Sequence, residues 1–197
     1  MGRAYPVKED NESNEALMAA YVRGDGSAFE RLFQRLAPRV HGFFLRTFRQ
    51  PTVADDLLQT TFLKLHRARA EYRPDRPLRP WLFTIAARVR LDELRRRRNL
   101  PEDADEETLA RTEDTRAEPA ASNNASATTD RADAVREALG RLPESQRVII
   151  LLHRYEGLTF PEIARALAIS EGAVKLRAFR AYERLRVELR PLLEEKA

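Results

Sequence analysis

The segment spanning residues 158–180 constrains this chain more than any other, because it encodes two helices separated by a tight turn. Thr159 is a good N-cap, and Glu162 stands where it completes a capping box. Pro161 falls in the first helical turn, where a proline is tolerated. Ser170 follows the short turn and caps the second helix. The spacing therefore predicts two successive helices separated by a tight turn.

The second of these helices is amphipathic, with one apolar face and one free face. The apolar face consists of Val174, Ala178, Ala181 and Leu185. Lys175 and Phe179 lie on the other side, with Leu176 beside them. A plain helical hairpin needs the apolar face but not two caps around so short a turn. The segment is therefore interpreted as a helix-turn-helix, whose second helix enters the DNA major groove.

Composition favours an all-helical protein without metal or cofactor chemistry. The 197 residues include only seven glycines and no cysteine, which excludes disulfides, thiolate catalysis and zinc fingers. The three histidines are scattered and lack metal-ligand spacing. Paired catalytic carboxylates, a nucleophile with its base and a phosphate-binding loop are also lacking, so we predict no enzyme, no metal and no cofactor. No signal peptide or long apolar run is seen, and we expect a cytoplasmic protein.

Three blocks follow one another along the chain: a helical domain at 10–99, an acidic linker at 100–132 and a second helical domain at 133–192. Expected helices lie at about 14–23, 27–36, 38–48, 52–70 with Thr52 as cap, 81–98, 131–139 and 143–155. The linker has one leucine and no aromatic residue, which predicts a flexible, disordered tether. A sharper hypothesis is that it mimics nucleic acid in a basic channel of a partner.

The stretch from Lys64 to Arg98 is strongly basic and ends in four consecutive arginines. It contains a proline-rich loop at 72–80, which begins with Tyr72 and is followed by Trp81. Aromatic rings beside cations are the means by which proteins bind single-stranded nucleic acid. Tyr72 could serve equally as a stacking platform or as a core residue, and Trp81 is expected to pack beneath the loop with one edge available.

The predicted helix at 52–70 carries a second stripe beside its apolar one. Asp56, Gln59 and Leu63 follow each other at helical spacing. Such a stripe is either an ordinary solvated face or a surface on which a partner helix docks.

Taken together, these motifs resemble those of the bacterial RNA polymerase sigma-70 family, of the extracytoplasmic-function type. ADDLLQTTF at 54–62 resembles the core-binding helix of region 2, and RPWLFTIA at 79–86 with LD at 91–92 resembles the strand-opening part. LPESQR at 142–147, EGLT at 156–159 and EIA at 162–164 resemble region 4. The resemblance implies an all-α protein with two helical domains, a sigma region 2 bundle and a sigma region 4 helix-turn-helix.

The resemblance also implies a role for each surface in promoter-specific transcription initiation. The residues that would contact core polymerase are Asp55, Asp56, Leu57, Gln59, Thr60 and Leu63. Those that would contact the −10 element are Tyr72, Arg73, Arg76, Arg79, Trp81, Arg88, Arg95 and Arg96. Those that would contact the −35 element are Thr159, Ser170, Glu171, Gly172, Lys175, Leu176, Phe179 and Arg180.

Three positions depart from the family pattern. Thr60 stands where glutamate is common, which removes one charge pair from the polymerase contact. Arg88 stands where asparagine is usual and adds positive charge near the melted strand. Leu176 replaces a common serine, and we hypothesise that Leu176 and Phe179 read thymine methyl groups while Lys175 meets a phosphate or a guanine.

The partners implied by the resemblance are the β′ clamp and β flap of core RNA polymerase, promoter DNA, and an anti-sigma factor, often membrane-bound, that wedges between the domains. No small-molecule substrate is implied. Two other functions stay open at this point: a stand-alone helix-turn-helix transcription regulator, and a regulatory protein that keeps the fold but only binds partners.

Overall fold

The computed structural model describes residues 12–99, 101, 104–108, 110 and 131–190, and this part of the chain contains helices and no strand. The first helical group consists of α1 (Asn14–Val22), α2 (Gly26–Phe48), α3 (Pro51–Ala68) and α4 (Leu78–Arg98), with a 3-10 turn (Arg69–Glu71) after α3. The second consists of α6 (Arg131–Arg141), α7 (Glu144–Ile150), α8 (Phe160–Leu167) and α9 (Glu171–Glu188), with a π-helical turn (Leu151–Tyr155) after α7. The prediction of an all-α fold is confirmed.

Helix α2 is continuous, whereas the sequence predicted a break before Pro38. The proline lies inside the helix, where it cannot donate the usual backbone hydrogen bond. Buried side chains continue on both sides of it, from Leu32 and Leu36 to Val40 and Phe43. Their burial against neighbouring helices outweighs the local cost of the proline, whose own side chain is exposed.

Two other helix starts differ from expectation. Helix α3 begins at Pro51 after Gln50, whose side chain makes no capping bond, so Thr52 is not the N-cap. Helix α4 begins at Leu78 rather than at Trp81. Its first turn is stabilised from outside the helix, because the Leu78 N–H donates to a carboxylate oxygen of Glu15 in α1 at 2.9 Å.

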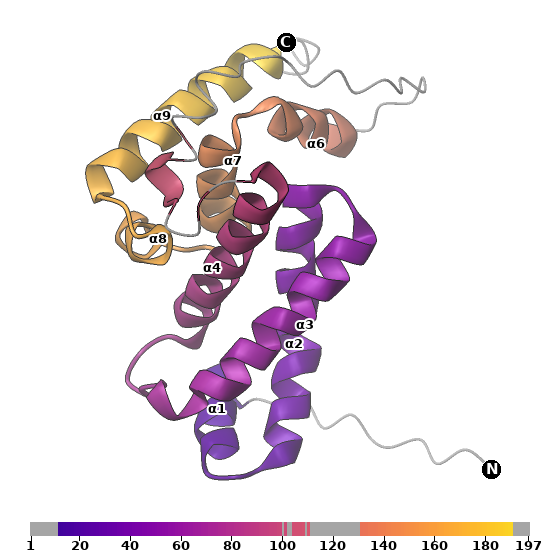
Figure 1. Cartoon of the computed structure of the whole chain (residues 1–197), viewed down its shortest axis with the longest axis vertical. Helices are drawn as coiled ribbons and strands as arrows, with labels where there is room; N and C mark the ends of the chain where they lie inside the picture. Colours follow the sequence, from indigo (N-terminus) through magenta and orange to yellow (C-terminus); the bar gives the residue numbers. More distant parts are fainter. Residues whose placement is uncertain (1–11, 100, 102–103, 109, 111–130, 191–197) are drawn as a thin grey trace, which may run out of the picture.

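The two helical groups pack directly on each other. In Figure 1, α4 lies beside α3 on one side and faces the second group on the other, where it packs against α8. A single apolar cluster runs across the boundary, from Leu82 and Phe83 of α4 to Ile163 and Leu167 of α8. A smaller cluster between α6, α7 and α9 contains Leu139, Leu142, Ile150 and Ala181.

Candidate nucleic-acid and partner interfaces

The helix-turn-helix is formed by α8 and α9, and its local geometry follows from the caps. The Thr159 hydroxyl accepts from the Glu162 N–H at 3.4 Å, and the Glu162 carboxylate accepts from the Thr159 N–H at 2.8 Å. Ala168 takes the left-handed conformation that ends α8, with φ of 55°. The Ser170 hydroxyl then accepts from the Ala173 N–H at 3.1 Å and starts α9.

The exposed face of α9 presents large apolar side chains to solvent. Leu176 is 50% exposed and Phe179 is 64% exposed, while Val174 and Ala178 on the opposite face are buried. Lys175 is exposed and its Nζ pairs with Glu171 at 2.7 Å. The remaining predicted −35 residues, Gly172, Arg180 and the two caps Thr159 and Ser170, are also exposed. The structure thus brings the predicted residues of α9 to one surface, which has the composition of a major-groove reader.

The polar stripe on α3 is solvent-exposed, as its spacing predicted. Asp55, Asp56 and Gln59 are exposed, and Leu63 is 49% exposed. Asp55 also lies 3.3 Å from Nε2 of His41 in α2. An exposed leucine in an acidic and amide stripe gives a partner helix both apolar and polar contacts.

Two residues of that predicted surface are turned inward. Leu57 is 8% exposed and belongs to the apolar core, so the structure assigns it to packing rather than to partner contact. It follows Asp56 directly, and adjacent helix residues point about 100° apart. Thr60 is half-buried, and its hydroxyl donates to the Asp56 carbonyl at 2.8 Å, which leaves less of it available to a partner.

Tyr72 shapes the proline-rich loop from beneath. It is 6% exposed, its hydroxyl donates to the Arg76 carbonyl at 2.8 Å, and its ring centroid lies 5.3 Å from that of Trp81. Burial raises the pKa of Tyr72 to about 12. Of the two roles that the sequence left open, the structure favours the core residue, and Tyr72 is therefore no stacking platform in this conformation.

The other predicted −10 residues divide into exposed and engaged side chains. Arg73, Arg76 and Arg88 are exposed, and Trp81 is half-buried. Arg79 is half-buried because its Nη2 donates to the carbonyl of Glu156 in the second helical group. Burial, together with nearby Arg39, lowers the pKa of Arg79. The loop therefore offers cations to solvent at its tip and is tied down at its end.

The arginine run at the end of α4 is held in ion pairs with its own helix. The buried Glu93 carboxylate accepts from Arg96 at 2.9 Å and from Arg97 at 2.6 Å. Hydrogen bonds from Arg96 and Arg97 lower the pKa of Glu93, against the effect of burial. Arg95 pairs with Asp92 at 3.1 Å and also donates to the Ala104 carbonyl. A phosphate would have to compete with these carboxylates.

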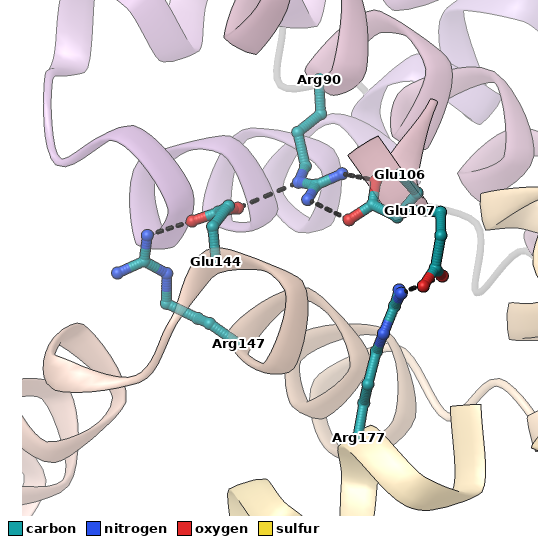
Figure 2. Close-up of polar contacts among 6 residues, drawn as sticks. All are labelled: Arg90, Glu106, Glu107, Glu144, Arg147 and Arg177. Atoms are coloured by element: carbon teal, nitrogen blue, oxygen red, sulfur yellow. Dashed lines mark hydrogen bonds and ion pairs between the residues drawn. The ribbon is translucent and has the colours of Figure 1, made fainter. Parts of the chain in front are cut away.

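A buried ionic network joins the two helical groups, although no sequence pattern predicted it. Arg90 of α4 is fully buried. Its Nη1 and Nη2 each donate to Glu106 at 2.9 Å, and its Nε donates to Glu144 of α7 at 3.0 Å. Figure 2 shows Arg90 between the two carboxylates. The one signal in the sequence that could have identified Arg90 is its position on the core side of α4, where Val89 and Leu94 also lie.

Within the described part of the chain, no group of three or more His, Cys, Asp or Glu could hold a metal ion. Among the helices of the described residues, none combines the length and the apolar character that a membrane-spanning segment requires. One open hollow of about 370 Å³ lies between α6 and α9, lined by residues that include Ala138, Leu142 and Val187.

Two family models match this chain. The Sigma-70 region 2 family model matches residues 32–100, and the Sigma-70, region 4 model matches residues 132–185. The chain is 40% identical over 174 residues to the RNA polymerase sigma factor CarQ of Myxococcus xanthus, covering 86% of this chain and 93% of CarQ. It is 38% identical over 173 residues to the ECF RNA polymerase sigma factor SigM of Mycobacterium tuberculosis, covering 88% and 83%.

A solved structure has the same fold. CnrH, determined in complex with the cytosolic domain of CnrY, superimposes with a TM-score of 0.60 at 28% sequence identity. The match covers 94% of this chain and 100% of that chain.

Proposed function

The chain belongs to the sigma-70 family, as an alternative sigma factor of the extracytoplasmic-function type that directs promoter-specific transcription, and from this premise we propose how its surfaces divide that task. Residues 10–99 form region 2 and bind core polymerase and the −10 element. Residues 133–192 form region 4 and bind the −35 element. Residues 100–132 connect them; of these, 100, 102–103, 109 and 111–130 lie outside the described residues, as do the domain ends at 10–11 and 191–192.

The exposed face of α9 reads the −35 element. Leu176 and Phe179 are too exposed to be packing residues, and both can cover the methyl group of a thymine. Lys175 and Arg180 meet phosphate or guanine once Lys175 leaves Glu171. Glu171, Gly172 and the capping residues Thr159 and Ser170 border the groove, with backbone N–H groups at a helix N-terminus available to a phosphate.

The proline-rich loop and α4 handle the −10 element. Arg73, Arg76 and Arg88 are exposed cations that can follow a single strand, and the half-buried Trp81 offers an edge to an unpaired base. Arg79, Arg95 and Arg96 join them after release from their internal partners. Tyr72 supports this surface from below rather than touching DNA.

The α3 stripe of Asp55, Asp56, Gln59 and Leu63 docks on the β′ clamp, with Thr60 at its border. Region 4 supplies the contact to the β flap. The protein acts in the cytoplasm as a transcription initiation factor without an active site of its own. An anti-sigma protein holds it inactive; CnrH, a relative of the same fold, was solved with the cytosolic domain of CnrY.

The observation that supports this division best is the pair of exposed faces, on α3 and on α9, carried by separate helical groups. The test is run-off transcription with purified core polymerase on a randomised promoter library. Gln59→Ala should abolish specific transcripts, whereas Gln34→Ala, at an exposed glutamine of α2, should leave them unchanged.

Specific duplex binding without any transcript from core polymerase would instead indicate a stand-alone regulator. That alternative is not favoured, because models of both sigma regions match and the relatives are sigma factors.

A further inference from the structure

Arg90 of α4 is buried where the two helical groups meet. Its guanidinium is closed in by Glu106, which precedes the second group in the chain, and by Glu144, in the first turn of α7. Both carboxylates come from outside region 2. Since both of its ion-pair partners lie outside region 2, Arg90 is an interface residue rather than part of a domain core.

Residues 104–108 connect to both sides of that interface. Glu106 is 1% exposed and binds Arg90 with both carboxylate oxygens. The neighbouring Glu107 accepts from Arg177 of α9, and Figure 2 shows the two contacts side by side. Consecutive residues of the linker thus hold a region 2 helix and the recognition helix at once. The described part of the acidic linker therefore binds two arginines of its own chain, Arg90 and Arg177.

The arrangement they hold is incompatible with an assembled promoter complex. The positions in their names place the −10 and −35 elements about 25 base pairs apart, which at about 3.4 Å per base pair is a separation of about 85 Å. Here α4 packs against α8, and Arg79 at the end of the −10 loop bonds to Glu156 just before the helix-turn-helix. The two DNA-binding surfaces must separate before both can reach their elements.

The interface also contains buried polar atoms that oppose its closure. Among the described residues, buried polar atoms without a hydrogen-bond partner include Nε of Arg79, Nε of Arg147 and Nη1 of Arg177, all beside the boundary. Water would satisfy these atoms on opening, so desolvation opposes closure. Charge-assisted bonds such as those of Arg90 offset this cost, and loss of one carboxylate would leave a buried charge uncompensated.

We propose that residues 104–108 act as an intramolecular clasp, in which Glu106 on Arg90 and Glu107 on Arg177 hold the free protein closed and keep it from engaging both promoter elements. The regulatory meaning of the clasp rests on the proposed function, whereas closure itself does not. The α3 stripe stays exposed in the closed form, so core polymerase docks first and opening follows.

The experiment measures the distance between the helical groups in the free, full-length protein. The chain has no cysteine, so two exposed residues can be replaced by unique labelling sites for single-molecule energy transfer. These are Thr52→Cys at the start of α3, close to where the Arg49 side chain reaches Gly140 of α6, and Arg184→Cys in α9. The parent should give one narrow, high-transfer population. Glu106→Gln should move at least about half of the molecules to a broad, low-transfer population, and Glu107→Gln should move fewer.

The matched control is Glu137→Gln, which removes a carboxylate that pairs with Arg141 at the surface of the second group alone. It should keep the parent distribution. Three results would contradict the clasp. The parent could already show the broad, low-transfer population, Glu106→Gln could keep the parent distribution while retaining parent-like helicity, or the control could shift as much as Glu106→Gln. Because no polymerase is present, these outcomes are independent of the run-off assay that tests the proposed function.

Discussion

Arg39 of α2 and Glu156, just before the helix-turn-helix, form an ion pair with Nε and Oε2 3.1 Å apart. The same arginine donates through Nη2 to the Tyr155 carbonyl at 2.8 Å. Glu156 is only 3% exposed, and burial raises its pKa even though the hydrogen bond from Arg39 acts in the opposite direction. The interface between the two helical groups therefore contains a carboxylate, Glu156, whose charged form is disfavoured by burial.

This relationship predicts a pH dependence for Glu156→Gln. A raised carboxylate pKa means that the folded protein holds the proton more tightly than the unfolded chain, so the stability it contributes falls as pH rises through the folded-state pKa. Glutamine at position 156 does not titrate. The variant should therefore gain stability relative to wild type as pH rises from the carboxylate pKa of the unfolded chain to that of the folded protein. Urea unfolding across a pH series measures the difference, with Glu137→Gln, at a partly exposed carboxylate of α6, as the control. A difference between variant and wild type that is the same at every pH would contradict the prediction.

Lys175→Ala should change the salt dependence of DNA binding. A lysine that neutralises one phosphate contributes about 0.9 to the slope of log affinity against log salt, so the variant slope should be shallower by about that amount. Titration of a −35 duplex at several salt concentrations measures it. Arg23→Ala, at an exposed cation of region 2, should leave the slope alone. If both variants keep the wild-type slope, Lys175 does not meet a phosphate.

Replacing thymine by uracil in the −35 element should weaken binding of the wild-type protein. The change removes only the methyl groups that Leu176 and Phe179 are proposed to cover. Leu176→Ala should bind more weakly but discriminate less between the two duplexes, since its own share of the methyl contact is gone. Because Leu176 is 50% exposed, its replacement should alter the free energy of unfolding by less than about 0.5 kcal/mol. Equal affinity of the wild type for both duplexes would disprove methyl recognition.

Leu57→Ala and Leu63→Ala should have opposite effects, although the two leucines lie on the same helix. Leu57 is buried, and its truncation should cost about 2–4 kcal/mol of unfolding free energy with little change in core polymerase affinity of the folded protein. Leu63 is exposed, so its truncation should spare stability and weaken polymerase binding. Denaturant unfolding and a core-binding titration separate the two. If folded Leu57→Ala lost affinity for polymerase, Leu57 would have to be assigned to the docking surface after all.

Features determined by near neighbours in the chain could be predicted from the sequence. The capping box of Thr159 and Glu162 and the cap at Ser170 depend on residues three positions apart, and both are present as expected. The exposure of Gln59 and Phe179 followed from helical periodicity alone.

Features that depend on distant parts of the chain could not be predicted. Pro38 reads locally as a helix break, yet packing on both sides of it keeps α2 intact. Tyr72 looks the same in sequence as a loop aromatic or a core aromatic, and only its contact with Trp81 and its hydroxyl bond distinguish them. Glu106 belongs to an acidic run typical of a solvated tether, and its burial requires Arg90 and Glu144 to converge from separate domains.

The apolar cluster that runs from α4 into α8 has a consequence for how the molecule melts. Two domains that share buried surface lose it together, so the closed protein should unfold in one cooperative thermal transition. Once the domains are apart, each must rely on its own smaller core, and region 4 contributes the shorter helices. The number of heat-absorption peaks in calorimetry would thus report, without any label or nucleic acid, which arrangement a preparation of the protein has adopted.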